Sequence, residues 1–134
     1  MEWALLCLAT TIYFEARGEP ALGQIAVAQV VIERTISDDY PSTICEVVKQ
    51  GRYDHNGNPL RNQCHFSYWC DGKKEIIDDE SAAFKALLFG ALAFIVPPLT
   101  DRAVCYHSVR VSPYWADKER VTRTLSNHVF QKTC

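Results

Sequence analysis

Residues 3–35 read WALLCLATTIYFEARGEPALGQIAVAQVVIERT and predict two helices separated by a short break. In the first half, apolar residues recur at helical spacing, at Ala4, Leu5, Leu8, Ile12 and Ala16. Gly18 then stands where a helix cap is expected, and Pro20 suits the first turn of a second helix. This second helix should run to about Thr35.

The second helix is apolar over much of its surface. One stripe contains Ile25, Ala28, Val31 and Ile32, and it is widened by Ala26, Val27 and Val30. A helix with so broad an apolar face is expected near the centre of the core.

The rest of the chain predicts a mainly α fold of the α+β class, with long loops and a small β element. Residues 43–50 suggest a short helix, 51–63 a loop, and 65–69 a short strand or extended arm. A third clear helix is predicted over 79–95, ended by two prolines. Its inward candidates are Ala83, Ala86, Leu87, Gly90, Leu92 and Ala93. Residues 104–111 are a candidate strand.

Length and composition limit the classes of protein to consider. The 134 residues fit a single domain, 1–134, and 48% hydrophobic residues with 22% charged residues are ordinary for a globular protein. A net charge of −2 does not favour a nucleic-acid partner. The first apolar run, residues 3–9, is too short to cross a bilayer, and Glu2 precedes it where a signal peptide would carry a basic residue. We therefore expect no signal peptide and no stable membrane insertion.

Six cysteines, at positions 7, 45, 64, 70, 105 and 134, allow 15 pairings, and the sequence does not choose among them. Without a signal peptide, partly buried thiols are the simplest interpretation. Cys64 and Cys70 flank a short segment and could form a bridge in an oxidising compartment. Cys7 lies in a helical apolar pattern, which indicates a core position.

Glu15 is the candidate for acid–base chemistry. It ends an apolar helix beside two aromatic residues, and an apolar setting raises the pKa of a carboxyl group, as a general acid requires. The alternative is that Glu15 only pairs with Arg17 or caps the neighbouring helix. Glu19 is favourable at the start of the second helix and could also pair with Arg17.

Aromatic and polar residues suited to binding sugars follow in three stretches. The eight candidates are Phe66, Ser67 and Trp69, then Tyr106, His107 and Trp115, then Asn127 and His128. Asp71, Arg17 and Glu19 are expected to play supporting roles. The first stretch could equally be a hydrophobic loop closed by a turn at Asp71-Gly72. A zinc site built from His65, His107 and His128 lacks a familiar spacing, and so does a Cys105–His128 nucleophile pair.

Together these motifs resemble the spore-cortex-lytic type of cell-wall hydrolases, from about residue 6 to 130. The resemblance begins with residues 12–20, 23–28 and 30–31. It continues, in the family's order, with Tyr40-Pro41, Ile44-Cys45, Val47-Val48, residues 66–69, Asp71-Gly72, Tyr106-His107, residues 113–116 and residues 127–130. The chain departs from the family pattern at His65, at Val104-Cys105 and at Gln131.

The resemblance implies a lysozyme-like fold of the lytic transglycosylase or goose-type branch, with Glu15 as the catalytic residue. It implies peptidoglycan glycan strands as partner, cut between N-acetylmuramic acid and N-acetylglucosamine, and no metal or organic cofactor. A compact domain without a signal peptide also resembles phage or prophage endolysins. We expect a monomer made in the cytoplasm that reaches the wall after a holin opens the membrane.

The expected mechanism uses one carboxyl group. Glu15 protonates the glycosidic oxygen and then takes the proton of the muramic acid 6-hydroxyl, which leaves a 1,6-anhydro end. In a hydrolytic lysozyme, water would attack with help from a second carboxylate such as Glu19 or Asp71. A zinc amidase and a non-catalytic wall-binding module are the more distant alternatives.

Overall fold

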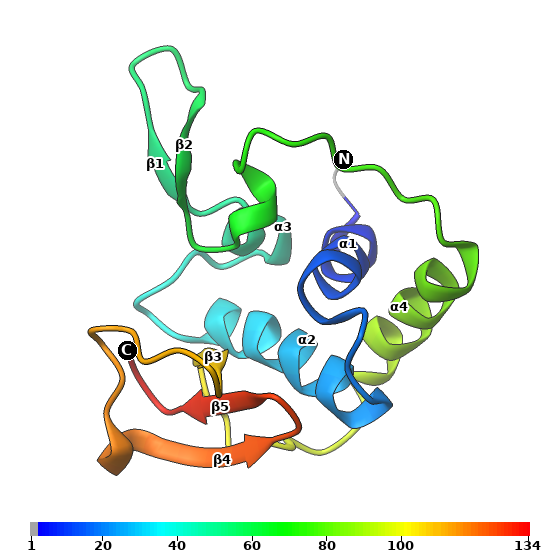
Figure 1. Cartoon of the computed structure of the whole chain (residues 1–134), viewed down its shortest axis with the longest axis vertical. Helices are drawn as coiled ribbons and strands as arrows, with labels where there is room; N and C mark the ends of the chain where they lie inside the picture. Colours follow the sequence, from blue (N-terminus) through cyan, green and yellow to red (C-terminus); the bar gives the residue numbers. More distant parts are fainter. Residues whose placement is uncertain (1–2) are drawn as a thin grey trace.

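The computed structural model describes residues 3–134 and has a helical part beside two small sheets (Figure 1). The helices are α1 (Ala4–Ala16), α2 (Ala21–Ile36), α3 (Ile44–Val48) and α4 (Glu80–Leu92), with 3-10 helices at Ser67–Trp69 and Lys118–Arg120. The strands are β1 (Gly51–Tyr53), β2 (Pro59–Cys64), β3 (Cys105–Ser108), β4 (Val121–Leu125) and β5 (His128–Gln131). The mixed α+β class matches the prediction. Met1 and Glu2 lie outside the described residues, so the expectation based on the acidic residue Glu2 before the first apolar run is not addressed by the structure.

Helix α2 is the centre of the fold, as its broad apolar face predicts. Ala26, Val27, Ala28, Val30 and Val31 have no exposed surface. Helix α2 packs against α1, α3 and α4, and it also contacts β3 of the three-stranded sheet. It therefore joins the helical part to the sheet, and the site described below lies along this junction.

Helices α1 and α4 form the most extensive helix pair. Gly90 permits the close approach, because a Cβ there would lie 3.3 Å from Leu5 Cδ1 and 3.6 Å from Ile12 Cδ1. The Asp79 side chain caps α4 by accepting a hydrogen bond from the Ala82 backbone N–H. The inward positions Ala86, Gly90 and Ala93 are buried, but Leu87 is 37% exposed, so the prediction was wrong there.

The β structure is more extensive than the sequence suggests. Residues 51–63, predicted as a loop, form most of the antiparallel β1–β2 hairpin, which projects from the molecule (Figure 1). Residues 65–69 were predicted as a strand or extended arm but include a 3-10 helix. The tail supplies β4 and β5, and the second sheet has the antiparallel order β3-β5-β4.

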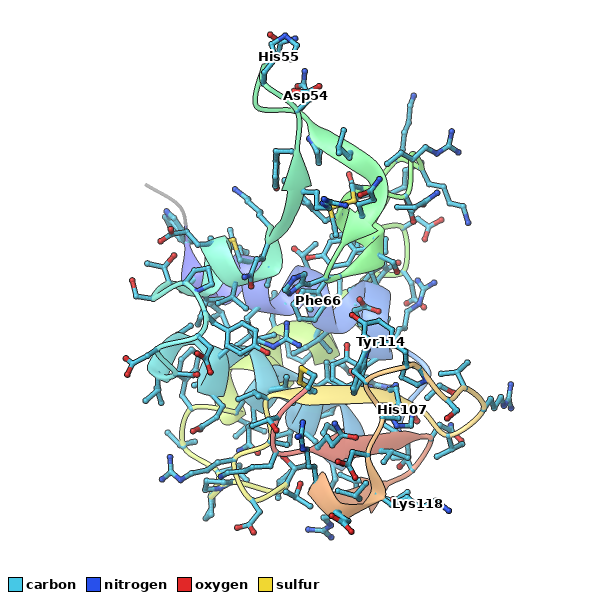
Figure 2. All side chains as sticks on the ribbon, turned by 90° about the vertical axis from the view of Figure 1, so that its left-hand side faces the viewer. Asp54, His55, Phe66, His107, Tyr114 and Lys118 are labelled. Carbon is cyan, nitrogen blue, oxygen red and sulfur yellow. A yellow bond between two sulfur atoms is a disulfide. The ribbon has the colours of Figure 1, made fainter. Side chains whose placement is uncertain are left out.

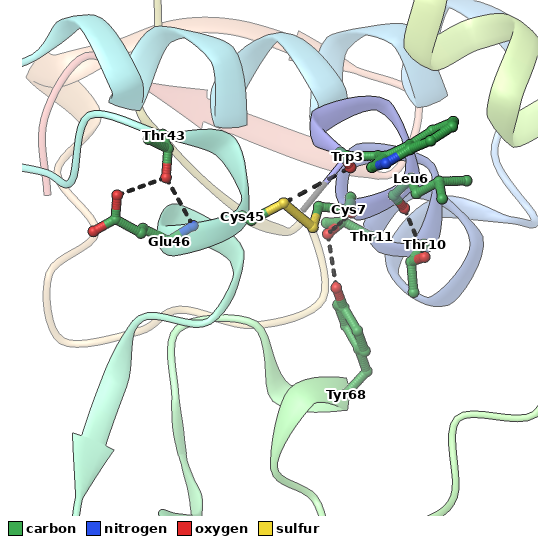
Figure 3. The surroundings of a disulfide bond; sticks show 9 residues. All are labelled: Trp3, Leu6, Cys7, Thr10, Thr11, Thr43, Cys45, Glu46 and Tyr68. Atoms are coloured by element: carbon green, nitrogen blue, oxygen red, sulfur yellow. Dashed lines mark hydrogen bonds between the residues drawn. A yellow bond between two sulfur atoms is a disulfide. The ribbon is translucent and has the colours of Figure 1, made fainter. Parts of the chain in front are cut away.

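All six cysteines are paired. Cys7–Cys45 joins α1 to α3 (Figure 3), Cys64–Cys70 closes the segment after the hairpin, and Cys105–Cys134 ties β3 to the end of the chain. The Cα–Cα distances of 5.3, 6.1 and 6.0 Å lie in the usual range for disulfides. The interpretation of the cysteines as thiols, with Cys7 only a core residue, is therefore wrong, whereas the Cys64–Cys70 bridge is present.

No helix within residues 3–134 is long and apolar enough to cross a membrane.

Candidate active site

Glu15 faces a cavity of about 520 Å³ that lies between the helical part and the three-stranded sheet. The cavity is lined by Glu15, Arg34, Tyr40, His65, Phe66, Ser67, Cys105, Tyr106, Tyr114, Trp115 and Cys134. Phe66 follows the hairpin and Tyr114 follows β3, and Figure 2 shows both near the middle of the molecule. Residues far apart in sequence thus meet around one carboxyl group.

The Glu15 carboxyl group is set up as a proton donor. Burial raises its pKa to about 7, because the charged form loses hydration. Within residues 3–134 it has no ion pair or hydrogen bond that would offset this effect. Near neutral pH the group can therefore both give and take a proton.

Arg17 does not neutralise Glu15. Its Nη1 donates a hydrogen bond to the Tyr13 hydroxyl, and its guanidinium lies 4.4 Å from the centroid of the Tyr13 ring. The Tyr13 hydroxyl in turn accepts a hydrogen bond from the Asp79 backbone N–H. The Glu15–Arg17 pair, which was the structural alternative to a catalytic role, is therefore absent.

Aromatic packing between α1 and the 3-10 helix Ser67–Trp69 supports the side of the cavity at which Glu15 lies. Phe14 stacks on Tyr68 with ring centroids 5.1 Å apart, and the Tyr68 hydroxyl shares a hydrogen bond of 2.8 Å with Thr11 Oγ1 (Figure 3). Burial, and to a smaller extent the Glu15 charge, raise the pKa of Tyr68 to about 12. The sequence did not single out Tyr68, because its position beside Glu15 depends on this tertiary packing.

Tyr106 presents a neutral phenol to the cavity. Burial is the main cause of its pKa being well above the usual value, and the Glu15 charge raises the pKa further. The ring is held by edge contacts with His128, 5.0 Å between centroids, and by Phe130 at 5.8 Å. Its hydroxyl can thus donate or accept a hydrogen bond but does not ionise near neutral pH.

The structure brings four of the eight predicted binding residues to the cavity beside Glu15, namely Phe66, Ser67, Tyr106 and Trp115. The other four do not line it. Trp69 supports the hairpin, because its Nε1 donates a hydrogen bond of 2.9 Å to the Tyr53 hydroxyl. His107 packs its ring edge-on against the lining residue Trp115, with centroids 5.5 Å apart.

Asn127 and His128 instead form a polar cluster with Glu19, in which His128 is buried and Asn127 is exposed. His128 Nδ1 lies 3.3 Å from Glu19 Oε1, and Asn127 Nδ2 donates a hydrogen bond of 3.2 Å to Glu19 Oε2. Burial lowers the pKa of His128, although the Glu19 charge opposes this shift. Glu19 thus ties the start of α2 to β5 and does not pair with Arg17, contrary to the prediction.

Asp71 has a turn-forming role in the structure. Its Oδ1 accepts a hydrogen bond of 2.9 Å from the Lys73 backbone N–H, and Gly72 between them has a φ of +81°. The turn predicted at Asp71-Gly72 is therefore present. Neither Asp71 nor Glu19 lines the cavity, so Glu15 is its one acidic side chain among the described residues.

Several lining residues were missed as sugar-binding candidates: Arg34, Tyr40, His65, Tyr114 and the Cys105–Cys134 disulfide. His65 was considered only as a metal ligand. Arg34 resembles an ordinary basic residue at a helix end, and no local pattern reveals that it is buried. A nucleophilic Cys105 is excluded by its disulfide. Among residues 3–134, no three or more His, Cys, Asp and Glu side chains cluster as a metal site.

Comparison with known proteins gives relatives of one kind. The chain is 44% identical over 45 residues to the spore cortex-lytic enzyme of Bacillus cereus, a match covering 34% of this chain and 17% of the relative. It is also 44% identical over 75 residues to the spore cortex-lytic enzyme of Halalkalibacterium halodurans, covering 56% and 19%. The matches thus span less than a fifth of these relatives.

Solved structures resemble nearly the whole chain. The catalytic domain of the germination-specific lytic transglycosylase SleB from Bacillus anthracis matches with a TM-score of 0.73 and 25% identity, covering 96% of this chain and 93% of that one. The catalytic domain of the Bacillus cereus SleB protein matches with a TM-score of 0.72 and 25% identity, covering 96% and 89%. The fold is therefore that of these domains, as the sequence motifs predicted.

A family model described as Cell Wall Hydrolase matches residues 18–131, a range that begins after Glu15 and contains the other lining residues except Cys134. The match covers most of the chain. The protein therefore belongs to the cell wall hydrolase family.

Proposed function

We propose that the protein cleaves the glycan strands of peptidoglycan as a lytic transglycosylase, between N-acetylmuramic acid and N-acetylglucosamine. The observation that carries this proposal is the Glu15 carboxyl group, which is unpaired, has a raised pKa and faces a cavity of about 520 Å³. The similarity to the SleB catalytic domains supports the same activity.

In the proposed reaction, Glu15 acts first as acid and then as base. Its proton passes to the glycosidic oxygen as the bond to the anomeric carbon of muramic acid breaks. The resulting carboxylate takes the proton of the muramic acid 6-hydroxyl, whose oxygen bonds to the anomeric carbon. The product carries a 1,6-anhydro ring, no water is consumed, and Glu15 ends protonated as it began.

Two neighbours are suited to orient the sugar. Tyr106 keeps its phenolic proton and can donate a hydrogen bond to the N-acetyl carbonyl. Ser67 adds a hydroxyl on the lining, next to the ring of Phe66. The apolar rings of Phe66 and Trp115 provide flat surfaces for sugar faces.

A hydrolytic lysozyme would need a group to position the attacking water. Glu19 and Asp71, the two candidates from the sequence, are engaged elsewhere: Glu19 with His128 and Asn127, and Asp71 in its turn. The arrangement therefore favours internal attack by the 6-hydroxyl over hydrolysis.

The proposal is tested with Glu15→Gln, which keeps the shape of the side chain but carries no ionisable proton. We expect lysis of purified peptidoglycan to fall by two or more orders of magnitude, roughly the contribution of a general acid. The matched control is Glu80→Gln, which makes the same change at an exposed carboxylate on α4. Unimpaired lysis by Glu15→Gln would leave a wall-binding role, and loss of wild-type activity with a chelator would favour a zinc amidase.

The site of action proposed here is the wall, outside the reducing cytoplasm. Three disulfides support this location, since such bonds form and persist in oxidising compartments. Release through a phage holin remains one proposed route to that location.

A further inference from the structure

Arg34 is held rigidly beside the cavity. It lies in the last turn of α2 and is only 8% exposed, although it carries a charge. Its Nε donates a hydrogen bond of 2.7 Å to the carbonyl oxygen of Val104. The guanidinium also lies 4.8 Å from the ring centroid of Tyr40 and 5.3 Å from that of Phe66. These contacts fix the orientation of the planar group.

One end of this guanidinium has no partner. Nη1 is buried and has no hydrogen-bond acceptor among the described residues. Ion pairs elsewhere in residues 3–134 join other side chains: Arg102–Glu33, Arg120–Asp117 and His128–Glu19. A buried charged donor without an acceptor is unfavourable, so a ligand that brings an acceptor would complete this site.

The unpaired group does not pair with the proposed acid. Burial accounts for the raised pKa of Glu15, and among the described residues Arg34 makes no ion pair or hydrogen bond with it. For Tyr106, burial is the main influence on the pKa, and both the Glu15 and the Arg34 charges act on it as well. Tyr106 is thus within electrostatic reach of both groups, which line the same cavity.

We propose that Arg34 binds a carboxylate carried by the muramic acid side of the glycan. A planar guanidinium with a free N–H matches the geometry of a carboxylate. N-acetylglucosamine has no such group. Muramic acid carries a lactyl carboxyl group, which is either free or joined to a peptide stem with carboxylates of its own. This assignment rests on the proposed function and makes Arg34 a determinant of specificity for peptidoglycan over neutral glycans.

Binding is measured without cleavage in the Glu15→Gln background, by calorimetric titration. One pair of ligands is peptide-free strands with lactyl carboxylates and the same strands with those groups amidated. The second pair is peptide-bearing strands before and after amidation of the stem carboxylates. We expect amidation of the carboxylates to weaken binding about 10- to 100-fold in at least one pair, which is the range for a lost charge-assisted hydrogen bond. The pair that shows this loss identifies the source of the carboxylate.

The variant Arg34→Gln in the same background should bind charged and neutral strands within about twofold of each other. Arg123→Gln, a matched loss of charge at an exposed position outside the cavity, should keep the full preference. Arg34→Lys retains the positive charge and should keep part of the preference for charged strands, so it serves as a second variant if Arg34→Gln misfolds. Circular dichroism checks the fold of each variant. Equal binding of charged and neutral strands with Arg34 intact, or a preference that survives Arg34→Gln, overturns the proposal.

The two proposals fail in different ways. If the wild-type protein cleaves strands while Glu15→Gln binds charged and neutral strands equally, the Arg34 subsite is wrong and the proposed function stands. If the carboxylate preference depends on Arg34 but no strand is ever cleaved, the subsite stands and the proposed function is wrong.

Discussion

Glu15 keeps its proton at a pH where an exposed glutamate has lost it, because folding removes water from the carboxyl group and supplies no positive partner. Arg17, two positions away, binds Tyr13 instead, and Arg34 donates its hydrogen bond to the Val104 carbonyl oxygen. The position of each cation therefore matters as much as the apolar surroundings.

This pKa predicts the pH dependence of cleavage. The reaction needs the protonated acid, so kcat/KM should fall as pH rises through about 7, the pKa of Glu15 in the free protein. Initial rates on soluble strands across this range give the profile. A rate that stays constant to well above pH 7 would mean that the protonated carboxyl group is not required.

The same pKa predicts how stability depends on pH. The unfolded chain releases this proton near pH 4.5 and the folded chain near 7, so between these values the folded state holds the extra proton. The free energy of unfolding should therefore fall as pH rises through this window, by up to about 3 kcal/mol. Urea unfolding should find Glu15→Gln more stable than wild type above pH 7 and similar below pH 4.5. Identical pH dependence of the two proteins would refute the raised pKa.

At the scale of elements, the disulfides close chain segments of very different length. Cys7–Cys45 closes a separation of 38 residues and holds the five-residue helix α3 against α1, whereas Cys64–Cys70 closes only 6. In the chain-entropy model a longer closed loop stabilises more. The three bridges should therefore differ in their contribution to stability.

Replacing the Cys7–Cys45 pair by alanines should cost about 4 kcal/mol, and replacing Cys64–Cys70 about 2 kcal/mol. Chemical denaturation of the two double variants measures both values. The reverse order would show that loop closure does not govern these bridges.

Predictability from sequence also differs between elements. Helix α2 could be predicted because its apolar stripe has helical spacing and is mostly buried. The β1–β2 hairpin could not, because its strands are largely exposed and so show no alternation of apolar and polar residues. In the site, local motifs identify five of the lining residues: Glu15, Phe66, Ser67, Tyr106 and Trp115. The burial of Arg34 against Tyr40 and Phe66 could not be predicted, because it depends on tertiary contacts.

At the scale of the whole molecule, the cavity exists because α2 holds the three-stranded sheet beside the helical part. Glu15 comes from the helical part and Tyr106 from the sheet, so neither part contains the proposed site alone. A glycan strand lying in the cavity would contact both parts and meet one acidic side chain, Glu15.

The most direct test of this account is mass spectrometry of the fragments that the wild-type protein releases from purified peptidoglycan. A single carboxyl group acting through the muramic acid 6-hydroxyl predicts fragments ending in 1,6-anhydro-N-acetylmuramic acid, and none from Glu15→Gln. Fragments ending in reducing sugars that take up isotopic oxygen from labelled water would contradict it, because water would then be the attacking group.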